Sequence, residues 1–116
     1  MKLDEIVREL KMEVKSAARN LSREVGGGYA SDLLSDVMAH ADTDYLWVTL
    51  QVHQNIVAVA VVKELAGIVI VNGRDPEQET LAKAEKEGVP ILVTQLPAFE
   101  IVGRLYQLGL RGTTRC

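Results

Sequence analysis

The chain is organised by an alternation of apolar and helix-like segments that runs from Tyr45 to Leu108. Short apolar runs at 45–50, 68–71 and 89–93 are separated by segments with helical spacing or composition. Strand–helix–strand order of this kind is typical of a parallel sheet covered by helices. The sequence therefore predicts an α/β fold, a two-layer or three-layer sandwich around a mainly parallel sheet. In such sheets, the polar loops that bind ligands meet at the carboxyl ends of the strands.

The size and composition of the chain describe one ordinary globular domain. With 116 residues, 47% of them apolar and 25% charged, the chain can build a single core. The net charge of -3, the scattered lysines and arginines and the 4% aromatic content argue against a nucleic-acid partner. No apolar run approaches the roughly 20 residues of a membrane span, and residues 1–5 lack the pattern of a signal peptide. We expect a cytoplasmic protein that does not contact a membrane.

The sequence carries no set of metal ligands and no cofactor motif. It has two histidines and one cysteine, Cys116, whose terminal position favours a tail thiol without a role. The glycine-rich stretch lacks the lysine of a kinase-type phosphate loop, and no Gly-x-Ser-x-Gly elbow is present. We therefore expect no metal, no cofactor and no enzymatic activity.

Three consecutive glycines at 26–28 are predicted to be irregular, because glycine loses the most backbone entropy in a strand or helix. We expect Gly27 or Gly28 to adopt a positive φ. The elements predicted around them are a helix at 2–10, strands at 12–16 and 21–25, and a helix capped at Ser31-Asp32.

The segment 53–66 is ambiguous, because its β-branched run alternates like a strand. Asn55 as a cap, the length of the run and Gly67 at its end favour a helix that is buried on nearly every side. The later predicted helices are one that begins at Asp75-Pro76 and stops at Gly88, and one at 97–108. We expect one domain at 1–108 and a flexible tail at 109–116.

Two stretches of the chain resemble the DRTGG domain family. The first, at 21–37, carries Arg23 and the three glycines. The second, at 67–94, includes Gly88-Val89-Pro90 at the start of its last predicted strand. The resemblance spans residues 1–108 and implies an α/β fold akin to the N-terminal domains of HPr kinases and Mur ligases. It also implies a regulatory or dimerising role. Ser22 stands where the family name has an aspartate, so a role tied to that carboxylate does not carry over.

Candidate ligand-binding residues are predicted to meet at the carboxyl edge of the sheet. His53, after the strand at 45–50, suits a phosphate, a carboxylate or a proton shuttle; alternatively, His53 and Asn55 cap a helix. The glycines at 26–28 either bind a nucleotide phosphate or reverse the chain. The predicted site for a small anionic ligand or nucleotide consists of Arg23, Gly26, Gly27, Gly28, His53, Asn55, Asn72, Gly73 and Thr94.

The last predicted helix carries more apolar residues than one buried face needs. Excess apolar surface marks a protein contact, although burial within the monomer is the alternative. The residues predicted to form a homodimer interface are Phe99, Val102, Leu105 and Tyr106. We expect a non-enzymatic, ligand-sensing dimer with a regulatory protein as a further partner. The alternative is a small nucleotide- or phosphometabolite-binding protein or enzyme that uses the glycines at 26–28 and His53.

Overall fold

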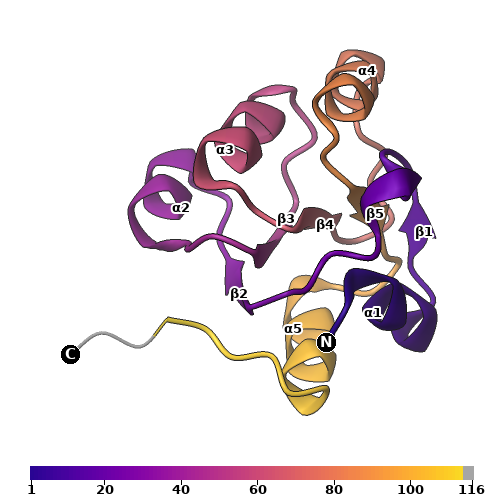
Figure 1. Cartoon of the computed structure of the whole chain (residues 1–116), viewed down its shortest axis with the longest axis vertical. Helices are drawn as coiled ribbons and strands as arrows, with labels where there is room; N and C mark the ends of the chain where they lie inside the picture. Colours follow the sequence, from indigo (N-terminus) through magenta and orange to yellow (C-terminus); the bar gives the residue numbers. More distant parts are fainter. Residues whose placement is uncertain (114–116) are drawn as a thin grey trace.

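The computed structural model describes residues 1–113 as a five-stranded sheet between two layers of helices (Figure 1). The strand order is β1-β5-β4-β3-β2, in which β2 to β5 are parallel and β1 pairs antiparallel with β5. The strands are β1 (Glu13–Val14), β2 (Gly27–Ala30), β3 (Tyr45–Thr49), β4 (Gly67–Ile70) and β5 (Ile91–Val93). The α-helices are α1 (Leu3–Leu10), α2 (Leu34–His40), α3 (Asn55–Lys63), α4 (Gln78–Glu87) and α5 (Ala98–Gln107), with a 3₁₀ turn, η1 (Ala18–Asn20).

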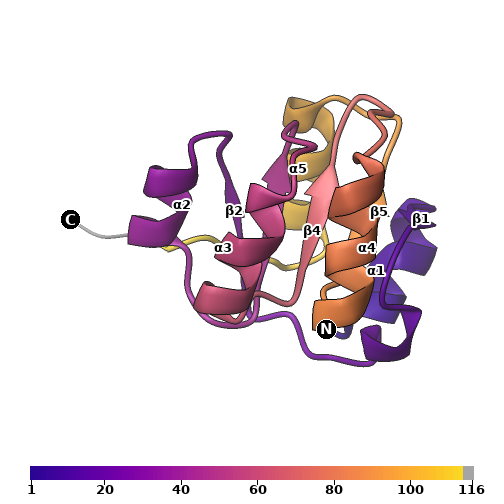
Figure 2. The same ribbon diagram turned by 90° about the horizontal axis from the view of Figure 1, so that it is seen from above.

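The three layers follow from the alternation of side chains along the parallel strands. Helices α2, α3 and α4 connect successive parallel strands and cover one face of the sheet, whereas α1 and α5 cover the other (Figures 1 and 2). On β3, Trp47 packs in the core under α2, α3 and α4, whereas Leu46 and Val48 pack in the core with α1 and α5. The predicted α/β fold is confirmed, and its arrangement is the three-layer one.

The glycines at 26–28 do not form the predicted irregular loop. Gly27 and Gly28 begin β2, in register with Tyr45 and Leu46 of β3, and the glycines with positive φ lie elsewhere in the described chain. The predicted positive φ is therefore wrong. A Cβ atom at Gly27 would lie 2.6 Å from the Arg111 carbonyl oxygen and 2.7 Å from Tyr45 Cε1, so close approach, not backbone conformation, requires glycine here.

Several predicted element ends differ from the structure. The strand predicted at 21–25 is a turn that bonds to the start of the chain: Lys2 and Glu24 form an isolated bridge, and the amides of Leu3 and Asp4 donate to the carbonyls of Arg23 and Leu21 at 2.9 and 2.8 Å. Helix α3 confirms the helical assignment, but its left-handed cap is Glu64 (φ 55°), and Gly67 already belongs to β4. Helix α4 starts at Gln78, later than Asp75-Pro76, and ends as predicted at Gly88 (φ 76°).

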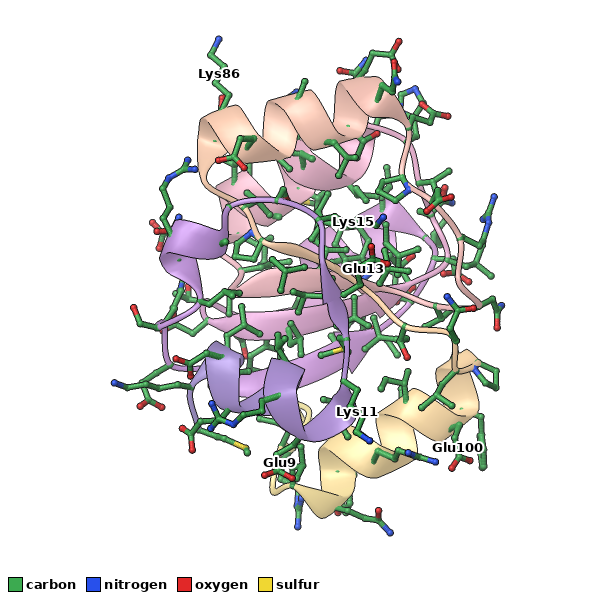
Figure 3. The ribbon with its side chains drawn as sticks, turned by 90° about the vertical axis from the view of Figure 1, so that its right-hand side faces the viewer. Glu9, Lys11, Glu13, Lys15, Lys86 and Glu100 are labelled. Atoms are coloured by element: carbon green, nitrogen blue, oxygen red, sulfur yellow. The ribbon has the colours of Figure 1, made fainter. Side chains whose placement is uncertain are left out.

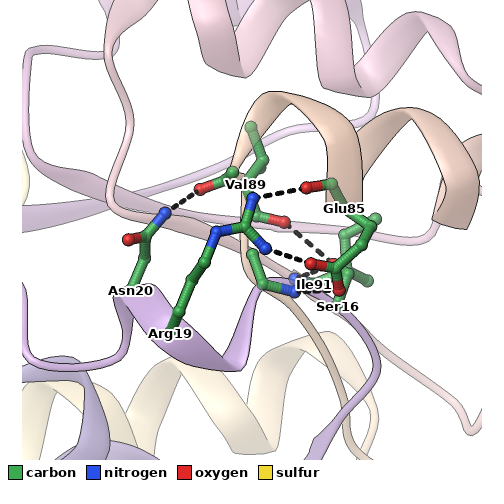
Figure 4. A network of polar contacts seen from close by, with 8 residues as sticks. Ser16, Arg19, Asn20, Glu85, Val89 and Ile91 are labelled. Atoms are coloured by element: carbon green, nitrogen blue, oxygen red, sulfur yellow. Dashed lines mark hydrogen bonds and ion pairs between the residues drawn. The ribbon is translucent and has the colours of Figure 1, made fainter.

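The segment between β1 and β2 is fastened to the end of α4 by polar contacts (Figure 4). The Ser16 hydroxyl donates to the Val89 carbonyl at 2.8 Å and accepts from the Ile91 amide at 2.9 Å. The Ala17 amide donates to Glu85 Oε1 at 3.0 Å, and Arg19 pairs with the same carboxylate. These bonds lower the pKa of Glu85, through the Ala17 amide first and Arg19 second. The contacts hold β1 beside β5.

The β1 side of the molecule carries charges of both signs. Lys15 pairs with Glu13 at 3.0 Å, and Figure 3 shows this pair among Glu9, Lys11, Lys86 and Glu100. Interspersed charges of this kind are typical of a solvated surface.

Residues 110–113 lie along the free edge of β2. The Gly28 amide donates to the Arg111 carbonyl at 3.0 Å, Leu110 is buried, and the Thr113 hydroxyl lies 2.7 Å from the Tyr45 hydroxyl. These residues, which we call the C-terminal strap, differ from the flexible tail expected at 109–116. The strap covers a strand edge that would otherwise expose unpaired amides. The terminal thiol, Cys116, lies outside the described residues.

Candidate functional site

The residues of the predicted ligand site lie at opposite edges of the sheet. Gly27 pairs with Tyr45 at the amino ends of β2 and β3, whereas His53 follows the carboxyl end of β3. At about 3.3 Å per residue, the strands separate these two edges by roughly 10–15 Å. A single site that uses both the glycines and His53 is therefore not formed.

At the amino edge, Arg23 is engaged by the chain itself. Its Nε and Nη2 donate to Asp44 Oδ1 at 2.9 and 2.7 Å, and its Nη1 donates to the Leu65 carbonyl at 3.1 Å. A further bond from Nη2 reaches the carbonyl of Glu64. This fork ties the turn before β2 to the turns before β3 and β4, which makes Arg23 a structural clip.

At the carboxyl edge, Asn72, Gly73 and Thr94 do meet, as predicted from the ends of neighbouring strands. The Asn72 amide donates to the Leu96 carbonyl at 3.0 Å, and the Gly73 amide donates to the Thr94 carbonyl at 2.8 Å. The Gln95 side chain covers Gly73 so closely that a Cβ there would lie 2.4 Å from its Oε1. The crevice between β4 and β5 is thus filled by its own loops.

His53 makes one local hydrogen bond in the turn before α3. Its Nδ1 accepts the backbone N–H of Asn55 at 3.2 Å, and both residues are exposed. No other side-chain hydrogen bond of His53 is found within residues 1–113. Asn55 is the first residue of α3, and the N-cap position is occupied by Gln54 without a side-chain cap bond, so His53 satisfies a loop amide and Asn55 does not cap the helix.

A groove opens instead between α5 and β2. Its floor is made partly of small residues. Gly28 and Ala30 of β2 pair with Leu46 and Val48 of β3 and face the same side of the sheet as they do. The cavity, of about 80 Å³, is what we call the α5–β2 groove; it is lined by Gly28, Tyr29, Ala30, Val48, Val102, Leu105, Tyr106, Leu110, Arg111 and Gly112. At its strap end, the Arg111 guanidinium lies 3.8 Å from the centre of the Tyr106 ring. An apolar floor with one cation at its end can hold a flat ring that bears an anionic group.

The other end of the groove leads to a further cavity at the carboxyl edge, mainly apolar but with Asp32 in its lining. This cavity, of about 180 Å³, shares Ala30 and Val48 with the groove. Asp32 Oδ1 accepts from the Thr49 hydroxyl and from the Leu50 amide, both at 2.8 Å. The fixed carboxylate can accept a hydrogen bond from a ligand hydroxyl, as acids after a β-strand do for ribose.

The four predicted interface residues of α5 divide into one buried and three exposed side chains. Leu105 is buried in the core between α5 and the sheet, so it cannot contribute to an interface. Phe99 is 92% exposed, Tyr106 57% and Val102 38%. These three apolar side chains, which we call the α5 apolar patch, leave uncovered area that burial within the monomer does not account for.

A cluster that the sequence analysis missed lies where β2 meets α2. The Tyr29 hydroxyl donates to Asp36 Oδ2 at 2.8 Å, and His40 Nδ1 lies 3.0 Å from Asp36 Oδ1. The Tyr29 and His40 rings stack with centroids 6.1 Å apart. The hydrogen bond from Tyr29, followed by one from Ser31, lowers the pKa of Asp36, and the same carboxylate raises the pKa of Tyr29. The spacing of Asp36 and His40, four apart in a predicted helix, is the signal that could have found the pair.

Two further features bear on function. Across residues 1–113, the structure has no group of three or more His, Cys, Asp or Glu that could hold a metal ion. None of the helices described for this part of the chain is long and apolar enough to cross a membrane.

Comparison with solved structures finds the same fold in the regulatory region of a pyrophosphatase. The structure contains the CBS and DRTGG domains of the regulatory region of Clostridium perfringens pyrophosphatase, complexed with an activator, diadenosine tetraphosphate. It superimposes with a TM-score of 0.70 at 16% sequence identity, over 88% of this chain and 44% of that chain. At this identity the likeness shows the fold alone, and this chain spans less than half of the other.

Comparison with curated proteins finds no match. The model of the DRTGG domain matches residues 5–108, which is nearly the whole described chain. Together with the five-stranded α/β sandwich, this match places the chain in the DRTGG domain family.

Proposed function

We propose that this chain is a regulatory module that binds a small anionic ligand of the nucleotide class and catalyses no reaction of its own. The observation that carries the proposal is the α5–β2 groove, with its apolar floor and the Arg111 guanidinium at its strap end. The regulatory region with the same fold, complexed with diadenosine tetraphosphate, supports the choice of ligand class.

The groove has features that suit a nucleotide. A base can lie on the flat floor of Gly28, Ala30 and Val48, since every base has an apolar face. Arg111 is exposed, and its Nη1 is fixed by the carbonyls of Tyr106 and Leu110 at 2.8 and 3.0 Å. The guanidinium is thereby held at the mouth of the groove, where it can pair with a phosphate.

The proposal is tested by titrating the protein with diadenosine tetraphosphate, ATP, AMP and inorganic phosphate, while recording amide chemical shifts and melting temperature. We expect saturable shifts at Gly28, Ala30 and Tyr106, and a melting temperature that rises with ligand concentration. Arg111→Gln should weaken binding about tenfold, because one charge-assisted bond is lost. His53→Gln, at an exposed site away from the groove, is the matched control and should leave binding unchanged. Shifts centred on His53 and Asn72, or no saturable shift with any nucleotide, would contradict the proposal.

We further infer that the module forms a homodimer through the α5 apolar patch. Burial of Phe99, Val102 and Tyr106 against a second copy would remove three exposed apolar side chains from water. Light scattering at micromolar concentration should give a dimer mass, and Val102→Glu should shift it toward the monomer, because an unpaired carboxylate is costly to bury. Val62→Glu is the matched control, since Val62 is 65% exposed on α3, on the opposite face of the sheet. A monomer mass at all concentrations, or equal weakening by both variants, would overturn the inference.

A further inference from the structure

A second cavity lies on the other side of the C-terminal strap from the α5–β2 groove. Its volume is about 310 Å³, and it is lined by Tyr29, Ala39, His40 and Thr113. We call it the His40 cavity. We propose that it binds the primary ammonium group of a small organic amine, with Nε2 of His40 as the hydrogen-bond acceptor.

The hydrogen bonds of His40 fix which ring nitrogen carries its proton. Nδ1 lies 3.0 Å from Asp36 Oδ1 and 3.2 Å from the Asp36 carbonyl oxygen. A carbonyl oxygen only accepts, and the lowered pKa of Asp36 keeps its carboxyl group ionised at neutral pH, so it accepts as well. Nδ1 is therefore the donor, and in the neutral ring the lone pair is on Nε2. In the described chain, no side-chain or backbone group donates a hydrogen bond to Nε2.

Asp36 also fixes the orientation of the ring. Its second oxygen accepts from the Tyr29 hydroxyl at 2.8 Å, and the Tyr29 ring stacks on His40 with centroids 6.1 Å apart. A histidine whose Nδ1–H is held by a carboxylate presents Nε2 in a defined direction. The side chains that hold His40 come from β2 and α2, both of which belong to the packed sandwich.

The charge around the cavity selects a cation over an anion. The stretch from Glu24 to Val62 contains no lysine or arginine. The carbonyl end of α2 falls at His40, and helix carboxyl ends carry partial negative charge. The nearest arginine along the strap, Arg111, lies over Tyr106 in the groove.

The β1 side of the molecule shows the contrast. There, lysines and glutamates alternate over the surface (Figure 3), so the local fields of opposite sign partly cancel. At the His40 cavity, the Asp36 carboxylate, the carbonyl end of α2 and the Tyr29 ring all attract positive charge. An ammonium group supplies both the charge and the N–H that Nε2 needs.

The test uses n-propylammonium chloride as the ligand and n-propanol as its uncharged counterpart of similar size. The full chain, labelled with ¹⁵N, is titrated with each at pH 8 while the imidazole nitrogens and the amides are recorded. In the free protein, we expect the Nδ1–H tautomer at His40 and the Nε2–H tautomer at His53. Propylammonium should shift the Nε2 resonance of His40 saturably, and propanol should bind at least about tenfold more weakly.

Two substitutions separate the site from general attraction to an acidic surface. Asp36→Asn should raise the Kd for propylammonium about tenfold, because it removes the charge and the group that orients the ring. Glu79→Gln removes one exposed carboxylate from α4 and should leave the Kd within about twofold. If Asp36→Asn does not fold, His40→Phe keeps a ring beside Tyr29 without the acceptor nitrogen and should abolish the saturable shift.

Three results would overturn the proposal: the Nε2–H tautomer at His40 in the free protein, equal binding of propanol and propylammonium, or equal weakening by Asp36→Asn and Glu79→Gln. The proposal is independent of nucleotide binding in the groove. Amine shifts centre on His40 and Tyr29, whereas nucleotide shifts centre on Ala30 and Tyr106, so the failure of either can be distinguished.

Discussion

Both histidines of this chain are exposed, but their Nδ1 atoms have opposite hydrogen-bonding roles. At the end of α2, His40 donates from Nδ1 to Asp36 and keeps a lone pair on Nε2. At the start of α3, the Nδ1 lone pair of His53 accepts a hydrogen bond from the Asn55 amide. What the other ring nitrogen touches decides whether a histidine can act on a ligand. His53 was singled out by its position at the carboxyl edge of the sheet. The signal at His40 is of another kind, a carboxylate four residues earlier that fixes Nδ1 as the donor.

The surroundings of the two histidines also differ in how they are assembled. Beside His53, the Val52 carbonyl accepts from the Glu77 amide at 3.2 Å and from the Thr80 hydroxyl at 2.7 Å, so this turn is tied to the start of α4. The His40 end joins β2 and α2, which follow each other in the chain, to the C-terminal strap, which is far away in the sequence. The turn before α3 therefore depends on packing against α4, whereas the cavity beside His40 depends on how the strap packs.

The largest effect is expected from overpacking the contact between β2 and the strap. In Gly27→Val, the Cβ atom would lie only 2.6 Å from the Arg111 carbonyl oxygen. We expect this clash to lower the free energy of unfolding by about 3 kcal/mol. Urea unfolding measures the loss, and the shifts of His40 should change while those of His53 do not. Gly26→Ala, whose Cβ would lie 3.6 Å from its nearest neighbour, is the control. Equal stability of both variants would show that the strap does not support the His40 end.

A smaller effect is expected when the strap loses its polar anchor. Thr113→Val removes the hydrogen bonds with Tyr45 (2.7 Å) and Asp42 (3.1 Å), and should cost about 1 kcal/mol. Thr43→Val, at an exposed threonine, should change stability by less than about 0.5 kcal/mol. Hydrogen exchange of the Gly28 amide, which bonds to Arg111, should accelerate only in the first variant. Unchanged protection of Gly28 would mean that Leu110 alone holds the strap.

The histidines themselves should separate stability from ligand binding. His53→Ala removes the acceptor at the start of α3 and should cost about 0.5–1 kcal/mol, with little effect on amine binding. His40→Ala removes the exposed pair with Asp36 and the ring that stacks on Tyr29; it should lower the free energy of unfolding only slightly, but should abolish the saturable response to propylammonium. Thermal unfolding and the amine titration, done on both variants, test whether His53→Ala affects mainly stability and His40→Ala mainly amine binding. A parallel loss in both assays for either variant would break the comparison.

The smallest effect is expected from acidification. The folded state lowers the pKa of Asp36, chiefly through Tyr29, and that of Glu85, chiefly through the Ala17 amide. A lowered pKa contributes stability that is fully present above the ordinary carboxyl range and is lost as pH falls through the lowered values, below about pH 4. The melting temperature should therefore fall between pH 5 and pH 2, and less steeply in Asp36→Asn or Glu85→Gln. Identical pH profiles for wild type and both variants would show that these carboxyls do not matter for acid stability.

The order of elements could be predicted because its signals are local. Apolar runs, caps and the helix-ending Gly88 report on neighbours within a few residues, and α3, α4, α5 and the strands β3, β4 and β5 lie close to their predicted places. The meeting of Asn72, Gly73 and Thr94 was also predictable, since the carboxyl ends of adjacent parallel strands must converge. The Asp36–His40 pair could have been found from helical spacing alone.

The sequence by itself determined an α/β sandwich, the order of β3, β4 and β5 along the chain and the helical assignment of α3. Only the tertiary structure decided that Gly27 and Gly28 form a strand, because pairing with β3 and contact with Arg111 outweigh the entropy that glycine loses. It also decided that the glycines and His53 lie at opposite edges, and that Tyr29 and Thr113 border the same cavity as His40. Contacts between distant segments reflect the packing of the whole chain, and no local pattern of residues records them.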